Sequence, residues 1–333
     1  AESKLYDMYV YDLCGKEVDM QWVEENNTNI QKSIDLQEGP LLKAALYKTD
    51  KEDHLLICLH HLVVDGVSWR ILAEDIGNAY IQSKQGQEID LPKKTASFKE
   101  WSELLNKYGE GIDEKSYWTS VLEEARTSDI HAEGTTIFTG YGHERVKLDS
   151  TYTSTLLYEA GNAYNTEIND LLLCGLALAI REWKGSDRVG IELEGHGREQ
   201  LHEPVETDRT VGWFTSVYPV VLKPAESIEE SIISIKEGLR QVPNKGIGYG
   251  ILACNGEIER YRPELCFNYL GHADGEASVE MQQSELGAGQ YISEWNKLPN
   301  GITINGSIVG NELELGVSYE LGRWSGEDIR GLC

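Results

Sequence analysis

Hydrophobic and polar positions alternate along this chain in blocks that predict both strands and helices. Apolar residues at every second position, or in short unbroken runs, predict strands, whereas apolar residues three and four positions apart predict helices. The strand-like segments are 41–49, 54–64, 188–194, 209–222, 263–271 and, as a hairpin, 301–320. The helical segments are 21–34, 68–82, 98–108, 166–185 and 227–242. Because both kinds of segment occur in both halves, we expect an α/β or α+β fold.

The helix over 166–185 has the strongest pattern. Apolar residues from Ile168 to Trp183 share one face, Thr166 is the expected N-cap, and Gly185 is the expected stop. A chain of 333 residues is long enough for about two domains. We therefore expect one domain over 1–150 and a second over 151–333.

The charge of the chain limits its partners. It has 30 Lys and Arg against 56 Asp and Glu, a formal net charge of −26 that is spread along the sequence. Nucleic-acid binding is not expected, because it depends on Lys and Arg at the phosphates, whereas a partner with a basic surface patch fits. The six cysteines form no Cys-x-x-Cys pair, no leader is visible, and the longest apolar run, Leu171–Ile180, is too short to span a bilayer. We expect a cytoplasmic protein that does not enter the membrane.

The segment HLLICLHHLVVDG, residues 54–66, is the first candidate for chemistry. In a strand over Leu55–Leu62, His60 and His61 would point to opposite faces, so one would do chemistry while the other braces the backbone. Asp65 and Gly66 then end the strand, and the N-terminus of the following helix favours developing negative charge. This arrangement suits a general base beside an oxyanion, although a pair of hydrogen-bonded core histidines is the alternative. Diverging histidines without further ligands do not predict a metal site.

Two later segments place polar residues where strands end. In ELEGHGRE, residues 192–199, Glu194 ends a strand against two glycines that flank His196, so it is a candidate acid or base. In CFNYLG, Asn268 and Tyr269 interrupt an apolar strand, and both can hydrogen-bond to an oxygen. A solvated strand end and ordinary packing are the respective alternatives. The glycine-rich PNKGIGYG lacks the Lys-Ser/Thr of a phosphate loop, so nucleotide binding is not expected.

Together these segments resemble a known family. HHLVVDG is similar to the His-His-x-x-x-Asp-Gly motif of the condensation-domain superfamily of nonribosomal peptide synthetases. EGHGRE, RTVGWFTSVYP, PNKGIGYG and FNYLG follow in the order found in epimerization domains of that superfamily. The resemblance extends from about residue 35 to the end. The Pro-x-Gln motif that usually precedes the His-His segment is absent, so we expect a first lobe that is partial at its N-terminus.

The resemblance implies two chloramphenicol-acetyltransferase-like lobes in a V, with a tunnel between them. It implies a cofactor-independent isomerase of antibiotic biosynthesis that makes D-amino acids. The substrate would be an aminoacyl or peptidyl thioester on the 4′-phosphopantetheine of a peptidyl carrier domain, which with adjacent synthetase modules would be the partner. No metal, pyridoxal phosphate or nucleotide is implied.

The resemblance and the chemistry together suggest roles for the marked residues. Inversion at an α-carbon needs a proton removed from one side and returned to the other, for which His61 and Glu194 are the natural pair. Tyr269, Asn268 and backbone amides near Gly66 would hold the enolate oxygen. The residues assigned to support are His60, Asp65 and Gly66. A condensation-type acyl transferase and a non-catalytic carrier-docking module are the alternatives.

Overall fold

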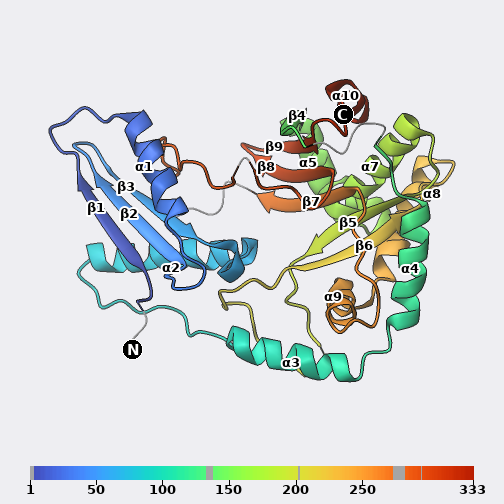
Figure 1. The fold of residues 1–333 in the computed structure, drawn as a ribbon, viewed down its shortest axis with the longest axis horizontal. Coiled ribbons are helices and arrows are strands. Elements are labelled where there is room, and N and C mark those ends of the chain that lie inside the picture. Colours follow the sequence, from blue (N-terminus) through green and yellow to red (C-terminus); the bar gives the residue numbers. More distant parts are fainter. Residues whose placement is uncertain (1–3, 133–137, 202, 273–281, 294) are drawn as a thin grey trace. The chain divides into compact units, whose positions relative to one another are not determined.

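The computed structural model describes residues 4–132, 138–201, 203–272, 282–293 and 295–333. The chain forms two compact units, each containing one β-sheet with helices, which confirms the expected mixed α/β class (Figure 1). The first unit consists of residues 1–98, 208–213 and 276–296, and the second of residues 99–207, 214–275 and 297–333. The division expected at residue 150 lies inside the second unit.

The first unit contains a three-stranded sheet, drawn in blue in Figure 1. Its strands, in sheet order, are β1 (Asp7–Asp12), β2 (Leu42–Lys48) and β3 (Asp53–Leu59), with β1 parallel and β3 antiparallel to β2. Its helices are α1 (Met20–Lys32), the short 3₁₀ helix η1 (His61–Val63) and α2 (Gly66–Lys84). Val23 and Ile30 of α1 pack against Ala45 and Tyr47 of β2 to form its core.

The second unit contains a six-stranded sheet in the order β4-β9-β8-β7-β5-β6. Its strands are β4 (Tyr141–Leu148), β5 (Val189–Gly195), β6 (Ser216–Leu222), β7 (Leu265–His272), β8 (Ile302–Val309) and β9 (Glu312–Glu320). Its helices are α3 (Phe98–Glu110), α4 (Lys115–Thr127), α5 (Ser150–Tyr158), α6 (Ala160–Tyr164), α7 (Ile168–Lys184), α8 (Ile228–Arg240), η2 (Pro243–Gly246), α9 (Ile247–Cys254) and α10 (Gly326–Leu332). Helix α3 begins at the boundary residue Phe98 and continues into this unit.

Helix α7 confirms the strongest sequence prediction. Its apolar face, which includes Leu173 and Ile180, is buried in the core of the second unit, where each such side chain contributes about 1.5–3 kcal/mol. Gly185 ends the helix in the left-handed conformation, with φ of +69°. The expected N-cap at Thr166 was wrong by one residue, because Glu167 and Asp170 form a reciprocal capping box instead.

The large sheet has one apolar and one polar face at its centre. Leu193 of β5 is paired with Phe267 of β7, and both belong to the buried core that α7 covers. Since side chains alternate along a strand, the residues one position away point to the opposite face. Glu194 and Asn268 are therefore carried on the face that α7 does not cover.

Two predicted strands are longer than the strands in the structure. The segment 54–64 is a strand only as far as Leu59 and then turns into η1. The segment 209–222 is a strand only over Ser216–Leu222, because its first residues belong to the other unit.

Within the described part of the chain, no helix combines the length and the apolar composition needed to cross a bilayer.

Candidate active site

The two adjacent histidines lie after a strand, not within one. His60 has extended backbone angles, and its Nδ1 accepts a hydrogen bond from the Leu62 N–H at 3.2 Å, which caps η1. Because the strand has ended before His60, alternating strand faces do not determine the directions of the His60 and His61 side chains. What separates the two rings is the turn, in which His60 satisfies a backbone amide and His61 begins the helix. His60 is half-buried, not buried as a core histidine would be.

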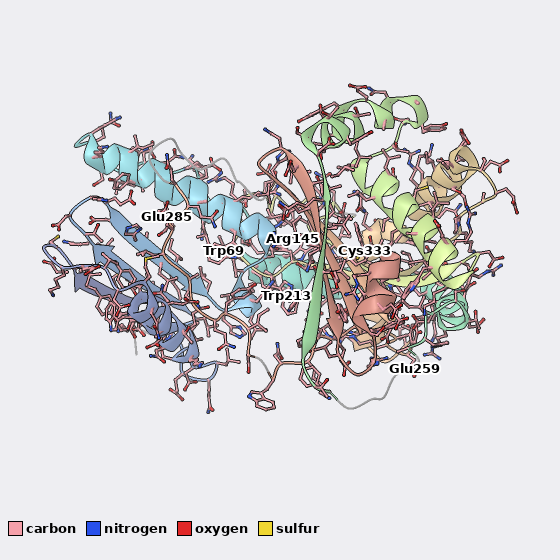
Figure 2. The ribbon with its side chains drawn as sticks, turned by 90° about the horizontal axis from the view of Figure 1, so that it is seen from above. Trp69, Arg145, Trp213, Glu259, Glu285 and Cys333 are labelled. Carbon is pink, nitrogen blue, oxygen red and sulfur yellow. The ribbon has the colours of Figure 1, made fainter. Side chains whose placement is uncertain are left out.

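His61 presents an exposed imidazole beside an indole. Its ring centroid lies 5.9 Å from that of Trp213, with the two planes at 66°, an edge-to-face arrangement. Trp213 is 43% exposed and is labelled in Figure 2. Trp213 stands inside the RTVGWFTSVYP segment that contributes to the family resemblance, but its sequence context alone does not mark it as a site residue.

Asp65 is connected, through the Ser68 side chain, to the segment that carries Trp213. Asp65 is 3% exposed and caps α2, where its Oδ1 accepts from the Ser68 N–H at 2.7 Å and lies 2.7 Å from Ser68 Oγ. Ser68 Oγ in turn accepts from the Gly212 N–H at 3.0 Å and lies 2.9 Å from the Gly212 carbonyl oxygen. The buried carboxylate thus fixes the backbone next to Trp213 through Ser68.

Further polar contacts anchor the same segment. The Arg209 guanidinium forms ion pairs with Glu74, at 2.9 Å, and with Asp75 of α2, and the Thr210 hydroxyl donates to the Ala96 carbonyl oxygen at 2.5 Å. These contacts fix the backbone that carries Trp213, and they therefore also fix the position of the indole relative to the His61 imidazole. Gly66 is the exposed first residue of α2, and the space beside its α-carbon is open among the described residues.

Glu194 presents a carboxylate at the end of β5. It is exposed, and its Oε2 accepts a hydrogen bond from Nδ2 of Asn268 at 2.9 Å. This bond continues the parallel register in which Glu192 faces Cys266 and Leu193 faces Phe267. Two residues predicted separately from ELEGHGRE and CFNYLG are thus brought together. Asn268 orients the carboxylate while leaving it accessible.

A second carboxylate lies behind the first. Glu192 points to the same face as Glu194 but is 4% exposed, and its Oε2 lies 3.7 Å from Nε of Arg262. Burial raises the pKa of Glu192, and Arg262 opposes that rise. Burial, followed by the charges of Glu194 and Glu192, raises the pKa of the Cys266 thiol, which fits a location on the same face. The site therefore combines one exposed and one buried acid.

The protein's own atoms lie close to both glycines that flank His196, and at Gly197 the backbone itself requires glycine. Gly197 has φ of +67°, and a Cβ there would lie 1.7 Å from the Phe214 carbonyl oxygen. A Cβ on Gly195 would lie 2.7 Å from the hydroxyl of Ser216. His196 itself contacts Glu199, with Nε2 and Oε1 3.0 Å apart. The close approach at this segment thus comes from neighbouring residues of the chain.

Tyr269 lies on the other side of the sheet from Glu194. It follows Asn268 directly in β7, so its side chain points to the apolar face, where its Cδ2 would be 3.3 Å from a Cβ on Gly306. Burial raises its pKa, as expected on that face. The prediction that Asn268 and Tyr269 bind the same oxygen is contradicted by the alternation of side chains along β7.

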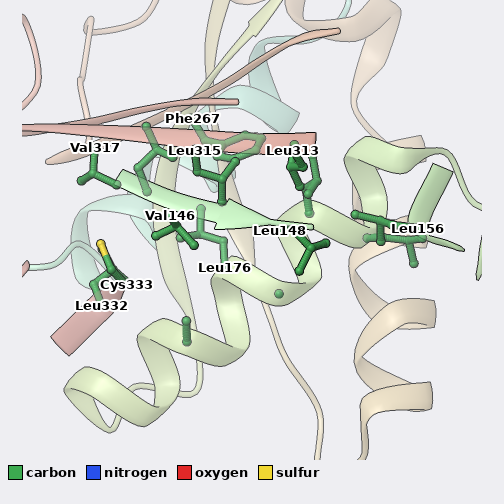
Figure 3. A pocket seen from close by; sticks show the side chains of 15 residues that line it. Val146, Leu148, Leu156, Leu176, Phe267, Leu313, Leu315, Val317, Leu332 and Cys333 are labelled. Atoms are coloured by element: carbon green, nitrogen blue, oxygen red, sulfur yellow. The ribbon is translucent and has the colours of Figure 1, made fainter. Parts of the chain in front are cut away.

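An apolar cavity of about 340 Å³ occupies this same covered face. Figure 3 shows side chains from β4, β7, β8, β9 and α7 around it, among them Val146, Phe267, Leu315 and Leu176. It is separated from Glu194 by the thickness of the sheet, and its lining residues are apolar apart from the thiol of Cys333. Nowhere among the described residues do three or more histidine, cysteine or acidic side chains converge in a way that could hold a metal ion.

The candidate chemistry is thus distributed over both units. His61, Trp213 and Asp65 belong to the first unit, while Glu194 and Asn268 belong to the second. Each unit presents one exposed group that can accept and donate a proton, and each group has a neighbour that fixes its position. Each of these two groups is of a type that can remove a proton from carbon or return one.

Comparison with known proteins gives the same family over nearly the whole chain. The family model of the Condensation domain matches residues 2–333. Bacitracin synthase 2 of Bacillus licheniformis is 39% identical over 344 residues, which cover 99% of this chain and 13% of that protein. Tyrocidine synthase 1 of Brevibacillus parabrevis is 39% identical over 354 residues, which cover 99% of this chain and 32% of that protein. The chain therefore spans a third or less of the length of these relatives.

One solved structure is similar in both sequence and fold. The epimerization domain from the third module of tyrocidine synthetase B is 40% identical to this chain, with a TM-score of 0.88. The similarity covers 98% of this chain and 76% of that one.

Proposed function

Because this chain belongs to the condensation-domain family, we propose that it is an epimerase that acts on a carrier-bound thioester. The substrate is an aminoacyl or peptidyl residue on the 4′-phosphopantetheine arm of a peptidyl carrier domain. The product is an L/D mixture at the α-carbon of that residue, for use in nonribosomal peptide synthesis. The observation that carries the proposal is the exposed Glu194 carboxylate held by Asn268, in a chain that is 40% identical to an epimerization domain.

The reaction needs two proton transfers and no other bond change. A base removes the α-proton, the electron pair of the C–H bond moves into the thioester carbonyl, and an enolate forms. An acid then returns a proton to the opposite side of the carbon. We assign one transfer to Glu194 and the other to His61, and each is worth about 10²–10⁴ in rate. The phosphopantetheine belongs to the carrier, and the epimerase supplies the acid, the base and the hydrogen-bond donors.

The enolate oxygen requires donors fixed in advance. Asn268 is suited to this task, because one of its amide hydrogens already binds Glu194 and the other remains directed away from that bond. The backbone amides at the start of α2, near Gly66, are the second candidate, since a helix N-terminus favours negative charge. Tyr269 is omitted from this role because it lies on the apolar face of the sheet. Asp65 and His60 support the backbone around His61.

The decisive experiment is incubation with a carrier-tethered L-aminoacyl thioester in D₂O, followed by chiral analysis and mass spectrometry. Epimerization predicts deuterium at the α-carbon together with the D isomer, without any acceptor amine. A condensation-type transferase would leave the thioester unchanged until an amine acceptor is added and would then form an amide. A docking module would bind the loaded carrier and change nothing. Either of the last two outcomes would refute the proposal.

A further inference from the structure

A row of residues crosses the polar face of the large sheet and continues outward from Glu194. Asn268 on β7 is paired with Asn305 on β8, Asn305 with Gly316 on β9, and Gly316 with Arg145 on the edge strand β4. Arg145 is labelled in Figure 2. Paired residues in neighbouring strands point to the same face, about 4.8 Å apart. Asn305 therefore lies about 10 Å from Glu194 along the row, two strands away.

Asn305 has an exposed carboxamide with unused hydrogen-bonding capacity. Across the residues that the structure describes, its side chain makes no hydrogen bond, whereas Asn268 donates to Glu194. A carboxamide offers two donors and an acceptor with two lone pairs. Asn is also disfavoured in strands, so local propensity does not explain its presence in the middle of β8.

Gly316, the next residue in the row, has no packing reason to be glycine. A Cβ there would meet, among the described atoms, only the Asn305 carbonyl oxygen at an ordinary 3.9 Å, and the backbone φ is not in the left-handed region. Gly306 on the opposite face is different, since a Cβ there would come within 2.9 Å of Leu315. A strand glycine often marks a bulge, a tight bend, or a close approach by a ligand or another backbone, and β9 pairs with β4 and β8 without a register shift at Gly316.

With the proposed function as premise, we propose that Asn305 binds the amide nearest to the thioester on the phosphopantetheine arm, and that Gly316 leaves room for the arm. Five bonds separate the reacting α-carbon from that amide nitrogen, an extended reach of about 6 Å. The Glu194 carboxylate must approach the same carbon to about 3 Å to take its proton. With about 3 Å more for the hydrogen bond between that amide and Asn305, the extended length is about 12 Å, which is enough to span the spacing of about 10 Å between Glu194 and Asn305.

The test is analogous to a double-mutant cycle, in which one change is made in the protein and the other in the phosphopantetheine arm. Carrier domains bearing the same aminoacyl group are prepared with the natural arm and with an arm whose first amide is replaced by two methylene groups. The kcat/KM for α-carbon exchange in D₂O is measured for the wild type and for Asn305→Ala. One lost hydrogen bond predicts that the wild type prefers the natural arm by about three- to tenfold. Asn305→Ala should lose that preference by slowing on the natural arm alone.

Matched variants separate this role from a change in folding. Ser307→Ala alters the same face of β8 one pleat away and should keep the wild-type preference. Asn305→Thr keeps a strand-forming side chain that is too short to reach the arm, so it should behave like Asn305→Ala. If Asn305→Ala and Asn305→Thr both retain the full preference for the natural arm, the effect of changing the arm does not depend on residue 305. The assignment of Asn305 to the amide of the arm is then overturned. Absence of exchange by the wild type on the natural arm would refute the proposed function instead.

Gly316 gives an independent measurement. Gly316→Thr places a side chain on the sheet beside Asn305, in the space assigned to the arm, and should lower kcat/KM on both arms. Its thermal midpoint should stay the same or rise, because threonine is favoured in strands and glycine is not. Wild-type kcat/KM in this variant would show that no arm passes over Gly316.

Discussion

Replacing Glu194 with glutamine removes a proton acceptor while leaving its surroundings nearly intact. The Asn268 amide donates to Glu194 Oε2 at 2.9 Å, and a glutamine oxygen at the same place accepts that bond equally well. The residue is exposed at the end of β5, so no buried charge is left without a partner. We therefore expect Glu194→Gln to change the free energy of unfolding by no more than about 0.5 kcal/mol.

The expected effect on the reaction is much larger than the effect on the fold. Loss of a general acid or base lowers the rate by about 10²–10⁴. At about 1.36 kcal/mol per factor of ten, this corresponds to about 2.7–5.4 kcal/mol in activation free energy. An effect of that size on activation with no measurable effect on unfolding would identify Glu194 as part of the chemistry.

The assay follows deuterium and configuration separately, starting from carrier-bound L and D substrates in D₂O. With one acid/base group removed, the other can still lift the proton and return a deuteron to the same side. We expect almost no inversion in Glu194→Gln, with residual exchange from one stereoisomer only. Glu182→Gln, an equal charge change on the exposed side of α7, should behave like the wild type. Near-wild-type inversion from both isomers would remove Glu194 from the mechanism, and loss of all exchange from both would make it the single base, with His61 stabilising the enolate.

Three other changes test the remaining assignments. His61→Ala should abolish inversion at an unchanged thermal midpoint, with residual exchange only from the stereoisomer opposite to that of Glu194→Gln, whereas His60→Ala should mainly lower the midpoint; full inversion by the first variant would refute the role of His61. Ser68→Ala leaves the buried Gly212 N–H without its acceptor, so urea unfolding should show a loss of about 1–3 kcal/mol, while exposed Ser83→Ala should show none. Burial raises the pKa of Glu192 above its ordinary 4.5, so its folded form holds the proton more tightly and stability falls as pH rises through that raised pKa. Glu192→Gln should make this fall shallower in urea unfolding between pH 4 and 8, and an unchanged slope would contradict the assignment.

The elements that could be predicted from the sequence are those whose pattern is set by one buried face. The helices expected over 68–82, 98–108 and 227–242 correspond to α2, α3 and α8, and the hairpin over 301–320 is the antiparallel pair β8 and β9. The segment 209–215 failed for a physical reason. Its apolar and aromatic residues look like the start of a strand, but Arg209 and Gly212 are bound to side chains of α2. Such long-range polar contacts leave no periodic signal in the sequence.

The candidate site was predicted in part, and its two errors come from one rule. Alternation of faces was applied to His60 and His61, where the strand has already ended, and it was not applied to Asn268 and Tyr269, where the strand continues. The meeting of Glu194 with Asn268 could not be deduced, because it depends on β5 and β7 being neighbours with a crossover between them. Trp213 could not be assigned either, since its position against His61 depends on Ser68 binding the backbone of Gly212.

The residues that carry the family resemblance fall into two groups, those that stabilise the local fold and those that present an exposed reactive group. Asp65 is used within the fold to hold a helix start and, through Ser68, a loop, while Gly197 is used to let another part of the backbone pass closely. His61 and Glu194 instead leave a proton-accepting group exposed. A variant of the first kind should lose stability, with activity falling as a consequence, and a variant of the second kind should lose activity alone. Measuring unfolding and exchange on the same variants therefore separates a residue that builds the site from one that acts in it, which motif membership by itself does not do.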